Sequence, residues 1–292
     1  MADRGHVPVM LKEVLAALKP RKGKVLVDCT VGLGGHSVEL LGKKATVIGL
    51  DLDPANLEVA RARLEEAGGT FELHHSNFAG LPTVLAGRQV DGILADLGVS
   101  SPHIDDPRRG FSYRKPGPLD MRMDPTRGQP AWALLERMTE EELAQAILHL
   151  GDEEDAPAIA RLIVQRRPVR TTNELASIVC EARDFTLQRA AGAKLHPAAR
   201  TFQAIRMLVN REMPNLERLL AVAPECLKPG GTAAIISFHS GEDRRVKQAF
   251  REGLRTGVYD KVSDDPVVAT EQERRANPRS SSAKLRWARR SK

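Results

Sequence analysis

The sequence predicts an α/β fold in which a parallel sheet is covered by helices and interrupted by a helical insert. Three observations predict it. Apolar, β-rich runs alternate with helix-like segments, a glycine-rich turn follows the first run, and more than 130 residues separate Gly98 from the run that begins at Thr232. Alternating strands and helices are typical of a parallel sheet. A gap of this length is far too long for a single crossover.

The strands are expected at residues 25–29, 45–50, 71–74, 90–95 and 232–238. The second is followed by a helix that begins at Pro54, since proline is favoured in a first turn, and ends before the glycine pair at 68 and 69. The helix at 196–212 carries an apolar stripe that is typical of core packing.

The long gap is predicted to hold a loop followed by helices. Residues 100–130 are rich in Pro, Gly, Asp and Arg, whereas capping boxes start helices at Thr139 with Glu142 and at Thr171 with Glu174. Between them, residues 152–168 begin with acids and end in Arg-Arg-Pro, which suits a helix and its stop. We therefore predict a discontinuous α/β domain at 1–107 and 205–292, and a loop plus inserted helical substrate-recognition domain at 108–204.

Composition indicates a soluble globular chain, with 41% apolar and 28% charged residues among 292. No apolar run is long enough for a membrane span, and the start lacks the apolar stretch of a secretory signal, so a cytosolic protein is expected. The three cysteines are far apart, and the adjacent His74 and His75 of a strand point to opposite faces. We therefore expect no metal site.

The charge of the chain indicates an anionic partner. The formal net charge is +6, and residues 274–292 hold eight Lys and Arg and no Asp or Glu. Such a tail favours a nucleic acid, or it is a solvated and partly disordered terminus. Leu285 and Trp287 within it indicate either order or a stacking contact with a base.

The glycine-rich turn lies in "VLVDCTVGLGGHSVELL" and matches the dinucleotide fingerprint only in part. Its pattern is Gly32-x-Gly34-x-x-Ser37, with serine at the packing glycine. Asp53 follows Gly34 by 19 residues, at the end of the next strand, where an acid can accept both hydroxyls of a ribose. The pair indicates an adenosine-containing ligand; the alternative is a tight turn and a structural aspartate.

Strand four ends in "DGILADLGVSSP", which places Asp96 beside the crevice, followed by Ser100 and Ser101. A carboxylate there could accept hydrogen bonds from an exocyclic amine such as N4 of cytosine. The lone pair of this nitrogen is delocalised into the ring, so the amine is a poor nucleophile. Hydrogen bonds to the carboxylate would localise the lone pair and aim it at a methyl group. The alternative is an aspartate that caps the next turn. A second polar cluster at a strand end, His239, Ser240, Glu242 and Asp243, either lines the active site or caps the next helix.

Basic and aromatic residues interleave after Asp96. Phosphate neutralisation and a stacking surface suit single-stranded RNA or a flipped base, and aromatics are scarce in this chain, which has seven Phe, two Tyr and two Trp. The alternative is a solvated loop. The candidate RNA contacts in this segment are Arg108, Arg109, Phe111, Tyr113 and Arg122.

These motifs resemble the RsmH (MraW) family of methyltransferases over essentially the whole chain. The resemblance rests on "HVPVML", "DCTVGLGGHS", "GLDLDP", "DGILADLGVSSP", "DDPRRGFSY", "DMRMD", "RTFQAIRMLVN", "SFHSGEDRRVK" and "NPRSSSAKLR". It implies a class I (Rossmann-like) S-adenosylmethionine-dependent methyltransferase with an inserted helical domain. The implied reaction is methylation of N4 of a cytidine in small-subunit (16S) ribosomal RNA, near the decoding centre and within the 30S subunit, with S-adenosyl-L-methionine as cofactor and no metal or membrane.

The resemblance also implies roles for residues. Asp53 would hold the ribose and Phe78 would lie beside the adenine. The implied sets are Gly34, Gly35, His36, Asp53, Phe78, Asp96 and His103 for the cofactor; Asp96, Ser100 and Ser101 for catalysis; and Arg279, Lys284 and Arg286, with the loop residues above, for RNA.

The chain departs from the family pattern at three positions, with His103 for Gln, Gly241 for Leu and Ser281 for Arg. Histidine can still make a hydrogen bond at the cofactor, while Ser281 removes one phosphate contact. Two rival functions remain open at this point. A nicotinamide-dependent oxidoreductase is disfavoured by Ser37 and the basic tail, and a non-catalytic RNA-binding assembly factor by the intact motifs.

Overall fold

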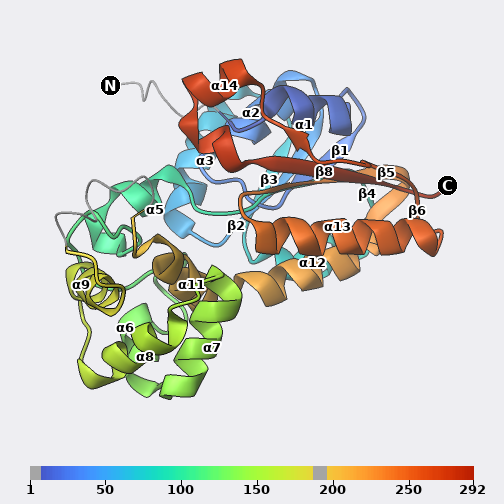
Figure 1. Ribbon diagram of the computed structural model, residues 1–292. Helices are drawn as coiled ribbons and strands as arrows, with labels where there is room; N and C mark the ends of the chain where they lie inside the picture. Colours follow the sequence, from blue (N-terminus) through green and yellow to red (C-terminus); the bar gives the residue numbers. More distant parts are fainter. Residues whose placement is uncertain (1–7, 187–195) are drawn as a thin grey trace. The chain divides into compact units, whose positions relative to one another are not determined.

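The structure, a computed structural model, describes residues 8–186 and 196–292 and divides into two compact units (Figure 1). The first unit runs up to Gly98 and from Met213 to Lys292, and the second from Val99 to Glu212. The first unit is thus built from two segments that are separated in the sequence by the second unit. The predicted insert spans residues 108–204, whereas the second unit begins nine residues earlier, at Val99, and ends eight residues later, at Glu212.

The first unit is built on one eight-stranded sheet with the order β3-β2-β1-β4-β5-β8-β6, in which β7 also pairs with β8. Pairs from β3 to β5 are parallel, and β8 is antiparallel to β5, β6 and β7. The strands are β1 (Val25–Asp28), β2 (Thr46–Asp51), β3 (Phe71–His75), β4 (Val90–Asp96), β5 (Leu227–Ser237), β6 (Tyr259–Val262), β7 (Val267–Val268) and β8 (Lys284–Arg290). The five predicted strands are confirmed, and the topology confirms the Rossmann-like methyltransferase fold.

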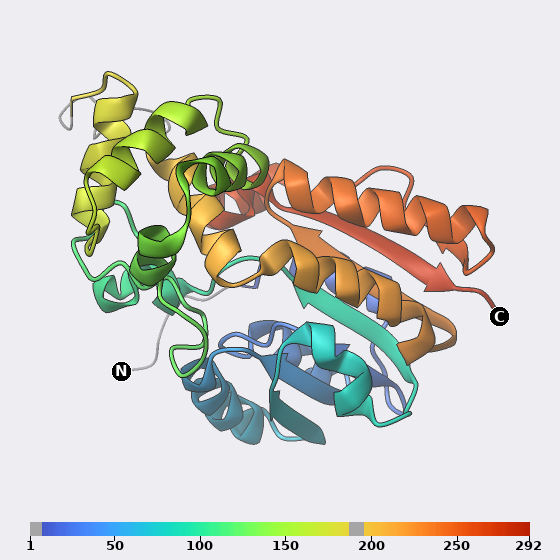
Figure 2. The same cartoon turned by 90° about the horizontal axis from the view of Figure 1, so that it is seen from below.

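Helices cover both faces of this sheet, as Figure 1 and the turned view of Figure 2 show. α1 and α2 lie on one face, and α12 and α13 on the other. The helical segments of the unit are α1 (Leu11–Leu18), α2 (Gly35–Gly42), α3 (Pro54–Ala67), η1 (Phe78–Gly80), α4 (Leu81–Leu85), α12 (Glu212–Cys226), α13 (Ser240–Arg255), α14 (Glu271–Ala276) and η3 (Pro278–Ser282). The bounds of α3 confirm the predicted proline start and glycine stop.

The basic tail forms a strand inside the sheet. β8 lies between β5 and β6, and its Leu285 is fully buried. Trp287 is half-buried and packs against the core. The alternative of a disordered terminus is therefore set aside, because this segment pairs with β5 and β6, and Leu285 and Ala288, which point to opposite faces of the sheet, are both fully buried.

The second unit is helical around its own apolar core. Its helical segments are α5 (Ser101–Asp105), η2 (Pro107–Arg109), α6 (Ala131–Arg137), α7 (Glu140–Gly151), α8 (Ala156–Gln165), α9 (Thr172–Ala182) and α11 (Ala199–Val209). Both predicted capping boxes are present, at the starts of α7 and α9. Ile147, Ile159 and Phe202 are among the core residues, and Leu119 and Met121 of the predicted loop are also fully buried there. The loop is therefore packed rather than solvated at these positions.

Within residues 8–186 and 196–292, no helix combines the length and apolar character that crossing a membrane requires.

Candidate cofactor and active site

The glycine-rich turn joins the carboxyl end of β1 to the start of α2. Gly32 and Gly34 adopt positive φ angles of 53° and 86°, which favour glycine. A Cβ atom on Gly34 would lie 3.4 Å from the Cα atom of Ala60 in α3. The backbone angle therefore favours glycine at position 34, and no side chain caps the N-terminus of α2 by a hydrogen bond.

Ser37 has its own function at the third position of the fingerprint. Its hydroxyl donates to Oδ2 of Asp28 at 2.7 Å, while the Thr30 N–H donates to Oδ1 at 3.2 Å. Asp28 is 1% exposed, and burial raises its pKa to about 6, although these two hydrogen bonds act in the opposite direction. The serine thus satisfies a buried carboxyl at the end of β1, which a glycine could not do.

Two aspartates follow β2, and they have different surroundings. Asp51 ends the strand, and its Oδ2 accepts from the Gly32 N–H at 2.7 Å, so its carboxyl lies against the glycine turn. Asp53 caps α3 by accepting from the Ala55 N–H at 2.9 Å and is 1% exposed. The role of Asp53 as ribose acceptor stays a prediction, and the geometry favours Asp51. Sequence spacing alone could not separate two acids two residues apart.

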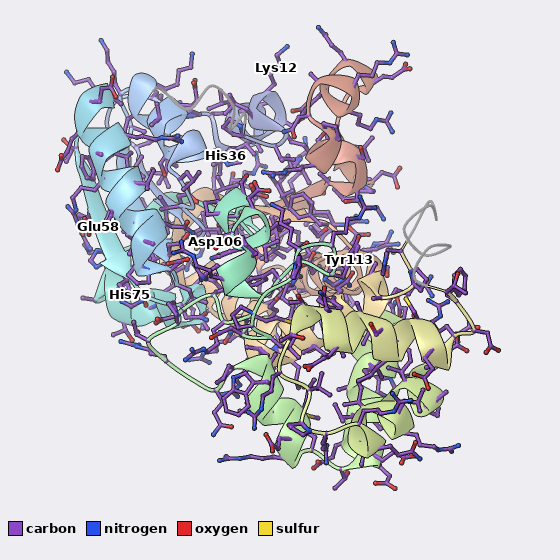
Figure 3. The ribbon with its side chains drawn as sticks, turned by 90° about the vertical axis from the view of Figure 1, so that its left-hand side faces the viewer. Lys12, His36, Glu58, His75, Asp106 and Tyr113 are labelled. Atoms are coloured by element: carbon purple, nitrogen blue, oxygen red, sulfur yellow. The ribbon has the colours of Figure 1, made fainter. Side chains whose placement is uncertain are left out.

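His36 lies in the first turn of α2 (Figure 3). Its Nε2 is 2.9 Å from the Val9 carbonyl oxygen, which only accepts, so Nε2 carries the proton of the neutral ring. Burial lowers the pKa of His36 to about 4. Its Nδ1 is 3.8 Å from Oδ2 of Asp96. The structure thus brings the glycine turn and the end of β4 together at this ring.

Asp96 ends β4, and its backbone N–H donates to Thr30 Oγ1 at 2.7 Å. The side chain is 22% exposed, but Oδ1 is buried and has no hydrogen-bond partner among residues 8–186 and 196–292. Burial, followed by the carboxyls of Asp28 and Glu242, raises the pKa of Asp96 well above its ordinary range. An acceptor atom of this kind is expected where a ligand completes the site.

Phe78 follows β3 and begins η1, where Asn77 caps the turn through the Ala79 N–H at 2.8 Å. The phenyl ring is half-buried. The Ser76 N–H donates to the Asp51 carbonyl at 3.1 Å, which ties the ends of β2 and β3 together. Phe78 therefore belongs to the same edge of the sheet as Asp51.

Ser100, Ser101 and His103 belong to the second unit. Ser100 Oγ lies 3.1 Å from His103 Nδ1 at the start of α5. His103 is 3% exposed and stacks on Phe111 at a ring-centroid distance of 5.0 Å. Within its unit, His103 thus organises a turn, and its predicted cofactor contact remains a prediction. His6 and Val7 of the "HVPVML" motif lie outside the described residues.

The two aromatic residues predicted to stack on RNA are used inside the second unit. Phe111 is 9% exposed beneath His103. Tyr113 stacks on His196 at 4.6 Å and packs edge-on against Phe202 at 5.7 Å. The Phe111 ring is therefore used in packing rather than in base stacking, whereas Tyr113 is half-buried and its predicted contact with RNA stays a prediction.

The arginines of this segment differ in availability. Arg108 is 86% exposed and pairs with Asp106 at 2.8 Å. Arg109 donates to the carbonyls of Arg122 and Met123, and the Arg122 side chain pairs with Asp120 at 2.7 Å while 21% exposed. Arg108 thus remains a surface candidate for RNA, whereas Arg109 and Arg122 hold the loop together.

The basic residues of the tail also separate into two groups. Arg279 is exposed, and Lys284 is 41% exposed with its Nζ 3.6 Å from Asp243. Arg286 is 4% exposed, and its Nε lies 2.7 Å from Asp243 Oδ1. The predicted RNA contact of Arg286 is therefore corrected, because a buried guanidinium in an ion pair cannot reach a phosphate. Ser281 is exposed in η3.

Among the described residues no group of His, Cys, Asp and Glu is arranged to hold a metal ion. The sheet order, the glycine turn and the acids that follow β2 and β4 define the class: an α/β methyltransferase with an inserted helical unit.

The comparisons with known proteins then define the family. The sequence model of the MraW methylase family matches residues 3–291, and the chain belongs to this family. It is 43% identical to ribosomal RNA small subunit methyltransferase H of Acidobacterium capsulatum, over 99% of each chain. The proteins of that name from Synechococcus sp. and Sorangium cellulosum are 47% and 46% identical, covering 98% of this chain and 92% and 90% of theirs.

Membership confirms the predicted family and, with it, the methyltransferase class and its cofactor, S-adenosyl-L-methionine. The oxidoreductase alternative is thereby set aside. The residues present fit the cofactor. They are the glycine turn with an α2 N-terminus that no side chain caps, Asp51 against that turn, Phe78 at the same edge, and Asp96, whose buried Oδ1 has no hydrogen-bond partner in the part of the chain that the structure describes.

Proposed function

We propose that this protein transfers a methyl group from S-adenosylmethionine to N4 of a specific cytidine in small-subunit ribosomal RNA, near the decoding centre and with the 30S subunit as substrate. Full-length relatives named for methylation of small-subunit ribosomal RNA support the substrate class. The proposed ribosomal substrate supports a cytosolic location.

The observation that carries the choice of atom is Asp96. An exocyclic amine is a poor nucleophile until its hydrogens are held by an acceptor, and Oδ1 of Asp96 is a buried acceptor without a partner in the described chain. When bound, S-adenosylmethionine supplies an electrophilic methyl group and a positive charge. Asp96 ionises more readily near positive charge, so its raised pKa would return toward the range of a carboxylate in the loaded site.

The remaining residues position the two reactants. The glycine turn and α2 N-terminus would receive the polar end of the cofactor, and Asp51 or Asp53 its ribose. Phe78 would contact the adenine. Ser100, Ser101 and His103 are proposed to act from the second unit, and Arg108, Arg279 and Lys284 to contact phosphates, because they retain surface exposure.

The test is incubation of the protein with methyl-labelled S-adenosylmethionine and small ribosomal subunits that lack the mark, followed by digestion and identification of the labelled nucleoside. Label in N4-methylcytidine is expected. Label in another nucleoside would refute the choice of atom, and cofactor binding without any labelling of subunits, free RNA or assembly intermediates would favour a non-catalytic assembly factor. Asp96→Asn is expected to lower the rate by about 10²-fold or more, with cofactor affinity measured separately.

A further inference from the structure

A histidine and a carboxylate are held together where β5 meets α13. His239 is the N-cap residue of α13, and Glu242 lies in its first turn. His239 Nε2 lies 3.2 Å from Glu242 Oε1. Glu242 is 2% exposed, and its other oxygen accepts from the Phe238 N–H at 2.8 Å. The carboxylate is therefore fixed by the backbone that carries the imidazole.

This arrangement favours one tautomer of the ring. Nε2 is buried and lies 3.2 Å from Glu242 Oε1, although it makes no hydrogen bond within residues 8–186 and 196–292. A carboxylate only accepts, so the proton of a neutral His239 is favoured on Nε2, and Nδ1 is left with a free lone pair.

The orientation of the ring depends on Gly241. A Cβ atom at this position would lie 3.2 Å from Nδ1 and 3.3 Å from Cε1 of His239. These contacts are tight, so glycine leaves room beside Nδ1 that a side chain would narrow. Glycine in place of the family's leucine at position 241 thus leaves space beside Nδ1 of His239, the nitrogen that carries no proton in this tautomer.

The pair lies next to Asp96 within the first unit. β4 and β5 are parallel neighbours, with Asp96 paired with Ile236 and the Leu97 N–H donating to the Ile236 carbonyl at 2.9 Å. A Cβ on Gly98 would lie 3.5 Å from the Phe238 ring. The charge of Glu242 contributes to the raised pKa of Asp96, which places it within electrostatic range. His239 and Asp96 therefore follow adjacent strands at one edge of the sheet.

We propose that His239, oriented by Glu242, is the catalytic base that takes the proton lost by the methylated amine. This inference rests on the proposed function. N4 forms a bond to the methyl carbon as the carbon–sulfur bond breaks, with the electron pair of that bond remaining on sulfur. N4 then carries positive charge and two hydrogens, and it releases one proton to Nδ1 of His239. The imidazolium, paired with Glu242, passes that proton to water.

The division of labour follows from the chemistry of the two side chains. Asp96 orients the amine by accepting hydrogen bonds, whereas a neutral imidazole can remove the proton and hold the resulting positive charge beside the Glu242 carboxylate. Arg286 supports the arrangement indirectly, because its ion pair with Asp243 fixes the first turn of α13.

The experiment compares His239→Ala, His239→Gln and wild type in single-turnover methylation of unmarked small subunits, with cofactor affinity measured by calorimetry. Removal of a general base lowers the rate by about 10²–10⁴-fold. We expect a loss in that range for both variants, unchanged cofactor affinity and a subunit KM within about threefold of wild type. Free imidazole should restore the His239→Ala rate at least tenfold, in proportion to its concentration. His149→Ala, an exposed histidine of α7, is the matched control and should match wild type.

Two results would overturn the proposal. One is a His239→Gln rate within threefold of wild type, which would assign the proton to Asp96 or to water. The other is a slow, folded His239→Ala variant that imidazole does not restore, which would make His239 a structural residue. If His239→Ala does not fold, the kinetics of His239→Gln decide. A lower kcat with an unchanged KM supports the proposal, and a higher KM with an unchanged kcat contradicts it. Inactive wild-type protein would instead refute the proposed function, so the two failures are distinguishable.

Discussion

The buried ion pair between β8 and α13 gives the sharpest test of how the basic tail is used. Arg286 is 4% exposed and Asp243 is 9% exposed, and their closest N–O distance is 2.7 Å. Burial alone would raise the pKa of Asp243, yet the Arg286 guanidinium holds that pKa below its usual range. Arg286→Met removes the guanidinium but keeps much of the apolar stem, so Asp243 becomes a buried and poorly compensated charge.

Breaking one side of a buried pair costs about 3–5 kcal/mol. Lys284 lies 3.6 Å from Asp243 and can compensate in part, which favours the lower end of that range. At about 2–4 °C per kcal/mol for a unit of this size, a loss of about 3 kcal/mol lowers Tm by about 6–12 °C. Thermal unfolding followed by circular dichroism measures the shift.

The matched control is Arg289→Met on the same strand, whose pair with Asp260 is 44% and 32% exposed and is expected to contribute about 0–1 kcal/mol. The double variant Arg286→Met, Asp243→Asn should recover most of the lost stability. A Tm within about 2 °C of wild type for Arg286→Met, together with weaker RNA binding and a shallower salt dependence, would refute this reasoning and restore Arg286 as a phosphate contact.

Three further predictions concern other acids and one aromatic ring. Asp51→Asn should weaken cofactor binding in calorimetry by about tenfold or more, while Asp53→Asn chiefly lowers stability; the reverse order would assign the ribose to Asp53. Burial raises the pKa of Asp28 from 3.8 to about 6, so the folded state binds the proton more tightly than the unfolded state does. Wild type should therefore gain about 2 kcal/mol of unfolding free energy over Asp28→Asn as pH falls from about 6 to 4, and equal slopes of stability against pH would contradict this. Tyr113→Ala should destabilise the helical unit by about 3 kcal/mol in urea unfolding through its lost packing on His196, whereas Tyr113→Phe should keep full RNA affinity; weakened RNA binding by the folded phenylalanine variant would speak for direct contact.

Local signals predicted those parts of the fold that depend on local chemistry. The buried parallel strands appear in the sequence as apolar runs. A proline and a glycine mark the start and end of α3, and the two capping boxes mark the starts of α7 and α9. The strands β6, β7 and β8 were missed. They are short or strongly basic, and β8 is stabilised by pairing with β5, which lies far away in the chain.

The candidate site was predictable where a residue type determines the chemistry. Glycines with positive φ, an acid at the end of β4 and a histidine at the start of α2 all lie at one edge of the sheet. Exposure was not predictable. Arg286 and Phe111 carry groups that suit contacts with RNA. Whether such a side chain is exposed depends on packing with segments that are distant in the sequence, and both side chains are buried by that packing.

The position of β8 has a consequence for synthesis of the chain. The helical unit is one continuous stretch, so all of its residues have been made once Glu212 has been added to the chain. The sheet cannot close at that point, because the strand between β5 and β6 is made after both of them. Until Lys284–Arg290 emerges, β5 presents an unpaired edge. The nascent chain therefore keeps the β5 edge exposed until its last strand is made. Chaperones that protect strand edges should bind the chain at this late stage of translation.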